Sequence, residues 1–207
     1  MARPRAHDEA LRIRLLERAG ELLSTHGPEA LSLRRLAGDV GTSTTAVYSL
    51  FGGKPGLVRE LYVEGFQRLG DRMEQVGLTN DPRADLTALG HAYRESALAN
   101  HNFYSIMFGN AVPDFTPDSE ARAQSRRSLR ALEHTVHRAV ETGEFVDAEP
   151  NEIVFAAWGL VHGLVSLELN GSAPTESTEA ERRSRYERAL QRGMAGWNRR
   201  GDSTGSS

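Results

Sequence analysis

Cysteine is absent from this sequence of 207 residues, and its absence excludes several kinds of protein. A chain without cysteine has no disulfide framework, no thiolate nucleophile, and no zinc or iron-sulfur centre built on thiolates. Long uncharged apolar runs are also missing. The most apolar segment, residues 153–169, contains His162, Ser166 and Glu168 and falls short of the roughly 20 apolar residues that span a bilayer. We therefore expect no membrane span, and residues 153–169 should form a buried helix. A signal peptide needs an apolar run near the N-terminus, but residues 11–16 are interrupted by Arg12 and Arg14, so we expect a cytoplasmic protein.

Alternation of apolar and polar residues with period two is missing as well, over the length of any strand. Apolar residues recur instead every three or four positions, which is typical of helices. The first such row consists of Leu11, Leu15, Ala19, Leu22 and Leu23. Helices are expected over residues 11–26, 33–40, 44–51, 54–76, 83–99, 103–108, 118–142, 151–169 and 179–197. The pattern therefore predicts an all-α fold, in which the helices after Pro82 are longer and more apolar than those before it.

The charge of the chain is low overall but unevenly distributed. Lys and Arg together number 25 and Asp and Glu 28, a net charge of -3. Residues 1–59 contain nine basic and six acidic side chains, a charge of +3, which leaves -6 for the remainder. The basic N-terminal part suggests contact with a polyanion. The acidic remainder argues against a nonspecific architectural DNA-binding protein. With 39% hydrophobic residues, the chain also has enough apolar material for a core.

Two short predicted helices, residues 33–40 and 44–51, are joined by Gly41 and fit a helix-turn-helix. Ser32 is the expected N-cap of the first, and Thr42 or Ser43 that of the second. The second helix would turn its apolar residues inward. Its outward residues are Thr44, Thr45, Tyr48 and Ser49. Small hydroxyls and one tyrosine can enter a major groove, donate to phosphates and touch base edges.

These residues resemble the tetracycline-repressor (TetR) family. The likeness rests on Arg34-Arg35-Leu36-Ala37, Gly41, Thr45-Ala46-Val47-Tyr48-Ser49-Leu50-Phe51 and Lys54. It covers residues 9–69 by motif and the rest by architecture. The resemblance implies that residues 44–51 lie in the major groove, that Tyr48 and Lys54 bind phosphate, and that Arg34 reads a base. Many members have a second aromatic residue and a histidine where this chain has Ser49 and Leu50, so one phosphate contact would be weaker or made by a hydroxyl.

The candidate DNA-binding residues come from both helices and from the turn after them. They are Ser32, Arg34, Thr42, Thr44, Thr45, Tyr48, Ser49 and Lys54. Lys54 stands at a helix N-terminus, where the helix dipole already favours an anion. The alternative is that the cations are solvated surface charges and Tyr48 an edge residue of the core. Arg3 and Arg5 could likewise form an arm on the DNA or a frayed terminus.

A single helix-turn-helix reads few bases, so we expect a homodimer on a palindromic, double-stranded operator. The last two predicted helices are the candidate interface, as the resemblance also implies. Residues 153–167 are apolar almost all round, which is more than one core face requires. The final helix has a narrower stripe of Tyr186, Leu190, Met194 and Trp197. Together the two helices would form a four-helix interface with the partner copy.

The resemblance further implies a cavity for a small-molecule effector in the C-terminal half. Aromatic and methionine side chains are typical of such cavities. The candidate lining residues are Tyr93, His101, Phe103, Tyr104, Met107, Phe108, Trp158 and His162. Trp158 and His162-Gly163 also resemble the Trp...His-Gly signature of one TetR C-terminal subfamily. His162 could contact a ligand or pack in the core, where Gly159 and Gly163 would favour close helix packing.

We therefore expect a ligand-responsive transcriptional repressor with two domains. These are a DNA-binding domain at 9–69, with its helix-turn-helix at 32–51, and a ligand-binding and dimerisation domain at 82–200; residues 201–207 would be a disordered tail. The alternative is an all-α small-molecule-binding protein or enzyme that uses the cavity, with His101 or His162 as base. No nucleophile or phosphate loop supports an enzyme, and we expect no catalytic residue, cofactor or metal. His134, His137 and Glu141 have chelating spacing but fit a solvated helix face better.

Overall fold

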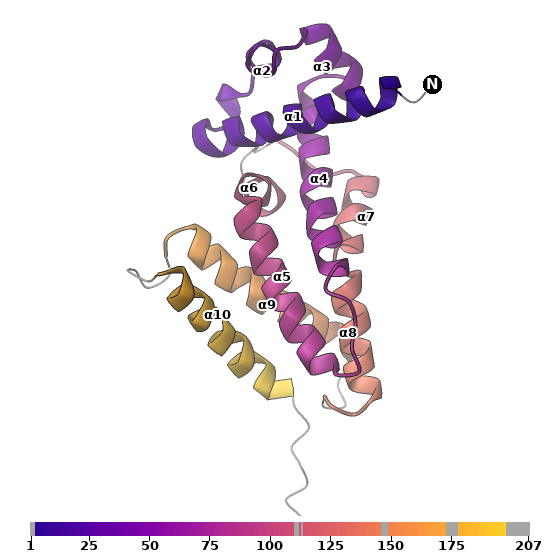
Figure 1. Ribbon diagram of the computed structural model, residues 1–207, viewed down its shortest axis with the longest axis vertical. Coiled ribbons are helices and arrows are strands. Elements are labelled where there is room, and N and C mark those ends of the chain that lie inside the picture. The colour runs from indigo at the N-terminus through magenta and orange to yellow at the C-terminus, as the bar shows by residue number, and fades with distance from the viewer. Residues whose placement is uncertain (1–2, 110–111, 113, 146–148, 173–177, 198–207) are drawn as a thin grey trace, which may run out of the picture. The chain divides into compact units, whose positions relative to one another are not determined.

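The computed structural model describes residues 3–109, 112, 114–145, 149–172 and 178–197, without the side chains of 3–7. These residues form ten α-helices and two short 3-10 helices and no strand, which confirms the predicted all-α fold (Figure 1). The chain divides into two compact units. Unit 1 is Met1–Arg68 with Asn100–Arg126, and unit 2 is Leu69–Ala99 with Arg127–Ser207. The predicted tail at 201–207 lies outside the described residues.

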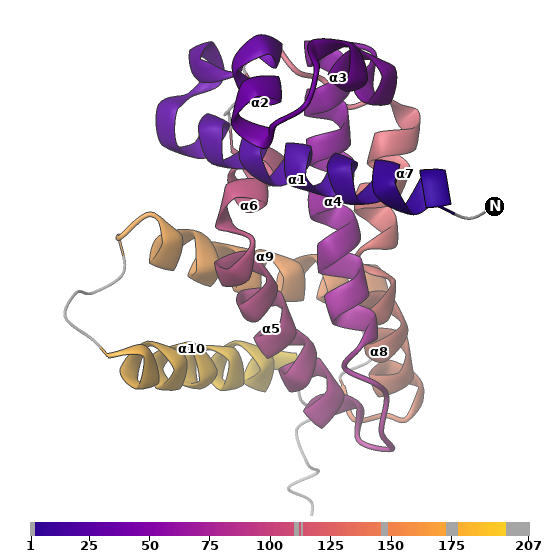
Figure 2. The same ribbon diagram turned by 45° about the horizontal axis from the view of Figure 1, so that its top comes forward.

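Unit 1 is built on the long helix α1, Arg3–His26. Its other elements are η1 (Pro28–Ala30), α2 (Leu33–Val40), α3 (Thr44–Phe51), most of α4 (Lys54–Glu74), α6 (His101–Phe108) and nearly all of α7 (Ser119–Arg127). Leu15, Leu16 and Leu22 of α1 are fully buried, together with Leu36 of α2 and Val47 of α3. Figure 2 shows α2 and α3 side by side, and α2 contacts α1.

The turn between α2 and α3 is close to the predicted one. Gly41 ends α2 with φ 74° and ψ 41°, a left-handed conformation that favours glycine. Ser43 precedes α3, and its Oγ accepts a hydrogen bond from the backbone N–H of Ala46 at 3.1 Å. Ser32 holds the predicted N-cap position of α2, but its side chain makes no capping hydrogen bond. Ser32 is exposed, so water can satisfy the first N–H groups of α2.

Unit 2 is arranged around α5, Pro82–Ala99, which makes most of its contacts with three other helices. These are α8 (Arg130–Glu141), α9 (Pro150–Leu169) and α10 (Glu179–Met194), and α10 continues into η2 (Ala195–Trp197). Leu86, Leu89 and Tyr93 are buried on α5, and Met73 is buried near the end of α4. Helix α10 lies beside α9 in both views (Figures 1 and 2).

The loop before α5 is tied to α8 by a buried carboxylate. Asp85 accepts hydrogen bonds from the backbone N–H and the hydroxyl of Thr79, at 3.0 and 2.7 Å, and from the Arg138 guanidinium at 2.9 Å. Burial alone would raise the pKa of the Asp85 carboxyl, but these hydrogen bonds outweigh it and hold the pKa below its ordinary value. Asp85 is therefore ionised and fully engaged within unit 2.

A buried arginine holds α5 to the last two helices. The Arg94 guanidinium donates to Glu168 of α9 at 2.6 and 2.8 Å and to Glu179 of α10 at 2.9 Å. Arg94 itself is only 3% exposed, so an unpaired charge there would be costly. Helix α10 begins beside this pair with a capping box, in which Thr178 and Glu181 satisfy each other's backbone N–H groups.

One predicted helix is divided in two. The sequence pattern predicts a continuous helix over 118–142, whereas α7 ends at Arg127 and α8 begins at Arg130. Ser128 is buried in this break, and its Cα lies 3.3 Å from the position that a Cβ on Gly70 of α4 would occupy. The two backbones thus approach closely at this point, and the helix is interrupted where they meet.

Helix α9, expected to be a buried helix, is buried on one side only. Its buried residues are Ile153, Val154, Ala157 and Val165. Phe155 is 71% exposed and Leu167 51% exposed. The helix is long and apolar enough to cross a membrane by length and composition alone, and 22% of its most apolar stretch is buried. Unit 2 supplies a partner for only one face of this helix, so within a single copy the expected burial is met on that face alone.

We predict that Gly56→Ala lowers the free energy of unfolding by about 1–3 kcal/mol. A Cβ at Gly56 would lie 1.9 Å from the backbone carbonyl oxygen of Phe51, so the end of α3 would have to move. Urea unfolding measures the effect. Gly38→Ala is the matched control, because a Cβ there meets nothing within 4 Å and should stabilise α2 by up to about 1 kcal/mol. Equal stability of the two variants would contradict the steric explanation.

Candidate nucleic-acid interface and ligand cavity

The outer face of α3 is neutral and rich in hydroxyl groups. Thr45 and Ser49 are exposed, Thr44 is half-buried, and Tyr48 is 55% exposed, while Val47 of the same helix is fully buried. The helix contains no charged residue. A surface of this kind can approach bases closely, but it has to rely on neighbouring elements for contacts to phosphate.

Cations of α2 and α4 flank this face. Arg34 is exposed on α2, and no carboxylate of the described residues lies within 4.0 Å of its guanidinium. Its neighbour Arg35 is 3.9 Å from Asp39, a carboxylate that also binds Arg18 at 2.7 Å. The acidic residue of α2 is thus largely neutralised within the fold, which leaves Arg34 available to an external anion.

Lys54, at the start of α4, makes one internal contact. Its Nζ donates to the backbone carbonyl of Pro28 in η1 at 2.9 Å. The side chain remains exposed, and an ammonium group has three donors, so two are available to other acceptors. A Cβ on the preceding Gly53 would lie 3.6 Å from Cε1 of Tyr48, which shows that the tyrosine ring packs beside this turn. Tyr48 and Lys54 therefore belong to one surface.

Ion pairs hold α1 to α4 below this surface. Arg12 of α1 donates to Glu60 and Glu64 of α4, at 2.9 and 3.2 Å. Arg68 of α4 donates to Glu17 of α1 at 2.6 Å, and its guanidinium lies 4.2 Å from the centre of the Phe103 ring. These charge-assisted hydrogen bonds fix the position of α4, and thereby that of Lys54, relative to α1.

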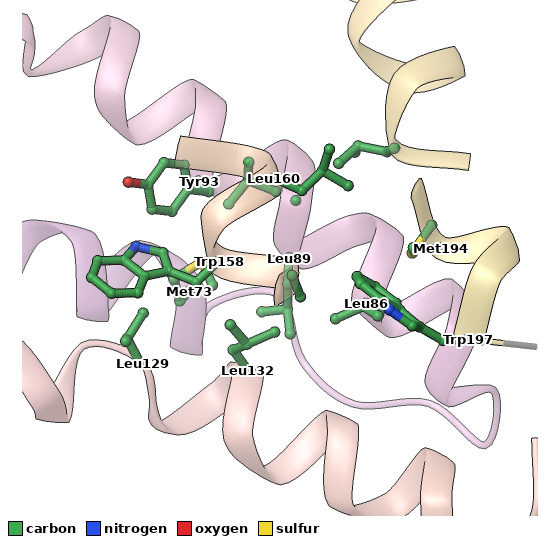
Figure 3. A pocket seen from close by; sticks show the side chains of 14 residues that line it. Met73, Leu86, Leu89, Tyr93, Leu129, Leu132, Trp158, Leu160, Met194 and Trp197 are labelled. Carbon is green, nitrogen blue, oxygen red and sulfur yellow. The ribbon is translucent and has the colours of Figure 1, made fainter. Parts of the chain in front are cut away.

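Unit 2 contains an apolar cavity between its helices (Figure 3). Fourteen uncharged residues from α4, α5, α8, α9, α10 and the segments adjoining α8 and α10 line it. The cavity volume is about 20 Å³, which is room for one water molecule. Pockets for small molecules typically measure about 300–1,000 Å³, so the cavity is much smaller in this structure than a pocket that holds a ligand.

Two family models match the chain. The model described as "Bacterial regulatory proteins, tetR family" matches residues 15–61, and "Tetracyclin repressor-like, C-terminal domain" matches residues 86–192. The second model alone covers more than half of the chain. The chain belongs to the TetR family. This is a family of transcriptional regulators and not of enzymes, in line with the sequence resemblance. The Trp...His-Gly subfamily stays a prediction.

Individual relatives share this architecture with the TetR-family chain. An HTH-type transcriptional regulator of Mycobacterium tuberculosis is 24% identical over 140 residues, which make up 66% of this chain but 60% of the relative. A Rhodococcus protein of unknown function has a TM-score of 0.73 at 26% identity, over 91% of this chain and 96% of that one. The TetR-family regulator PfmR of Thermus thermophilus has a TM-score of 0.68 at 23% identity, over 86% and 97%. These solved structures show the same fold.

The predicted effector-binding residues of this TetR-family chain divide between the two units. Tyr93 and Trp158 line the cavity, whereas His162 is not among the lining residues, although its Nδ1 lies 3.1 Å from the hydroxyl of Tyr93. The other candidates lie on α6 in unit 1 and are not among the cavity residues: Phe103 and Tyr104 are buried, Met107 and Phe108 half-buried, and His101 exposed. The aromatic residues of α6 pack against α1 and α4 instead, as in the edge contact between Phe108 and Phe66.

Several cavity residues were missed by sequence reasoning. Met73, Leu86, Leu89 and Leu132 belong to ordinary apolar rows, and no local signal separates cavity residues from core residues. The stripe of α10 that we expected to cover a partner packs inside unit 2. Tyr186 and Leu190 are buried there, and Leu190, Met194 and Trp197 line the cavity. The periodicity correctly shows that this face is covered, but not by what.

The histidines show no metal site in the described part of the chain, where no cluster of three or more His, Asp, Glu or Cys side chains is arranged to hold an ion. His134, His137 and Glu141 are each exposed on α8. His162 differs, because it is half-buried on α9 beside Tyr93. Burial lowers the pKa of its imidazole below the ordinary value of 6.5. At neutral pH it is therefore a neutral partner for the tyrosine hydroxyl.

We predict that His162 makes the protein less stable in acid. Because its folded-state pKa lies below the unfolded value, the unfolded chain binds the proton first, so stability falls as the pH drops through about 6.5. His162→Gln should remove this contribution, and its free energy of unfolding should depend less on pH. Urea unfolding between about pH 7.5 and 5 measures the difference. The exposed His101→Gln serves as control, and identical pH profiles for His162→Gln and the unmodified protein would contradict the assignment.

Proposed function

We propose that this chain is a ligand-responsive transcriptional repressor that acts in the cytoplasm and binds a palindromic operator as a homodimer. The observation that carries the proposal is the surface of unit 1 on which the hydroxyls of α3 and Tyr48 stand beside cations with no internal carboxylate partner. Arg34 and Lys54 are those cations among the described residues. Membership of a family of regulators supports the same function.

The proposed roles follow from chemistry. Tyr48 and Lys54 bind phosphate, since a phenol and an ammonium at a helix start suit an anion. Arg34 reads a base, because its fork of donors can bind guanine through two hydrogen bonds. Hydroxyls complete the surface: Thr44, Thr45 and Ser49 face the groove, and Ser32 and Thr42 adjoin the DNA backbone. The hydroxyl of Ser32 makes no capping hydrogen bond and is free to make such a contact.

The outer face of α9 supports the homodimer. Phe155 and Leu167 are exposed, and a Cβ on Gly159 or Gly163 would meet nothing within 4 Å. These small residues leave a flat apolar strip on which a second helix can lie closely. A membrane is a poor alternative, because Glu168 of the same helix binds the buried Arg94 and so fixes α9 within unit 2. We therefore assign this strip to a second copy of the chain.

The first experiment is binding of the purified protein to the DNA upstream of its own gene, with a salt titration and a scrambled competitor. A regulator of this type binds that DNA saturably, with two chains per site, and its affinity falls steeply with salt. Absence of selective binding there and in a random-sequence selection would overturn the proposal.

We predict different effects for the two kinds of DNA contact. Tyr48→Phe and Lys54→Ala should weaken binding about equally on all sequences, whereas Arg34→Ala should cost about 1–3 kcal/mol on the operator and relax the preference at one base position. Selection from a randomised operator library measures both effects. Arg126→Ala, an exposed arginine of α7, is the control. Loss of specificity in all three variants alike would contradict this division of roles.

We predict that Phe155→Asp separates the dimer, because it places a charge on the proposed apolar interface. Sedimentation equilibrium should show a dimer for the unmodified protein and a monomer for the variant, with operator affinity lowered at least about tenfold. Leu78→Asp is the matched control, since Leu78 is 49% exposed in unit 2 but lies outside α9. A dimeric Phe155→Asp variant would show that the strip is not the interface.

A further inference from the structure

The cavity of unit 2 has a lining without any charged side chain. Its residues are aliphatic, aromatic, methionine or glycine, and their polar side-chain atoms are the Tyr93 hydroxyl and the indole nitrogens of Trp158 and Trp197. In Figure 3, Tyr93 and Trp158 lie on one side of Leu89, and Trp197 lies on the other. The middle of the cavity is thus hydrocarbon, and hydrogen-bonding groups occur only towards its ends.

The charges closest in sequence to the cavity residues of α5 are already neutralised. Asp85 and Arg94 stand immediately before and after the stretch that supplies Leu86, Leu89 and Tyr93. Asp85 is bound by Arg138 at 2.9 Å, and the Arg94 guanidinium is bound by carboxylates of α9 and α10. An ionic ligand would therefore lose its hydration without gaining a counter-ion, which disfavours its burial strongly.

The Tyr93 hydroxyl at one end of the cavity has a neutral partner, His162, which is not itself a lining residue. The Tyr93 hydroxyl lies 3.1 Å from Nδ1 of His162, and burial keeps this imidazole uncharged at neutral pH. Such a pair can exchange a hydrogen bond with a hydroxyl or carbonyl group, but it offers no charge to a carboxylate or an ammonium ion.

Several side chains that line the cavity can change conformation. Met73 and Met194 contribute flexible, unbranched side chains from α4 and α10. On the α10 side, Gly193 makes room for the side chain of Leu160, whose Cδ2 lies 2.3 Å from the position that a Cβ on Gly193 would occupy. An apolar molecule can enlarge the present volume of about 20 Å³ by displacing methionine and leucine side chains, which tolerate several rotamers.

We propose that the effector of this regulator is a neutral, predominantly apolar small molecule that binds in the cavity of unit 2. The inference rests on the proposed function and specifies the ligand class of its effector site. Burial of the ligand's hydrocarbon surface supplies the affinity, and the Tyr93–His162 pair accepts one uncharged polar group.

The test compares three molecules that share one alkyl chain, 1-decanol, decanoate and decylammonium, at about pH 8, where the last two are charged. Trp158 and Trp197 are the two tryptophans of the chain, and both line the cavity, so intrinsic fluorescence reports its occupancy. We expect 1-decanol to change the emission saturably and to raise the Tm of the full-length protein, with affinity at least about tenfold above that of either ion. Naphthalene serves as a second neutral probe of flat shape. Equal binding of charged and neutral probes, or no binding of either neutral probe, would overturn the proposal.

A matched pair of variants places the binding site. Ala157 lines the cavity, whereas Ala84 of α5 is exposed and is not among the cavity residues. Ala157→Met should fill the cavity and abolish the response to 1-decanol, and Ala84→Met should leave it unchanged. A full response in Ala157→Met would place the probe elsewhere and overturn the assignment. Val161→Phe fills the same cavity from another position and replaces Ala157→Met if that variant does not fold.

Operator binding, measured on the same samples, separates this inference from the proposed function. Selective DNA binding without any response to neutral probes would refute the ligand class and leave the repressor intact. A selective response to neutral probes in a chain that binds no DNA sequence would refute the effector role itself. Release of the operator by 1-decanol but not by decanoate would support both together.

Discussion

Helices of eight residues are not stable alone in water, and the candidate DNA-binding surface of this protein consists of two of them. The leucine row of α1 provides what they lack. Leu15, Leu16 and Leu22 are wholly buried in one core with Leu36 and Val47, so the inner faces of α2 and α3 are covered within unit 1. The outer face of α3 is therefore not needed for packing in the core. Its residues are neutral and carry hydroxyl groups, which suits them for recognition.

The charged side chains divide in a similar way into those paired within the fold and those left for external contacts. Most arginines of unit 1 that approach the core are neutralised within the fold, as Arg12 and Arg68 are by glutamates that join α1 to α4. In unit 2 the buried Arg94 is matched in the same way. Cations without a carboxylate partner, such as Arg34 and Lys54, stand out against this background because their charge is not consumed internally. A chain of net charge -3 can in this way present a locally cationic surface.

Local signals in the sequence account for the parts of the structure that depend on local forces. Gly41 marks the end of α2, and the cap at Ser43 marks the start of α3. The helical period then determines which side of α3 is exposed. The break at Ser128 could not be predicted, because it arises where the chain meets Gly70, far away in the sequence. The partner of an apolar stripe could not be predicted either, since burial of Leu190 by its own chain or by another copy produces the same periodicity.

Lys54 is the sole lysine of the chain. Any reagent or enzyme that acylates lysine side chains can therefore modify one position only, apart from a terminal amine. Acylation would remove the positive charge at the start of α4 and leave a single N–H in place of three donors. The hydrogen bond to Pro28 and a contact to an external anion would then compete for that one N–H group. The scarcity of lysine thus concentrates all amine chemistry of the side chains on the surface that faces the proposed operator.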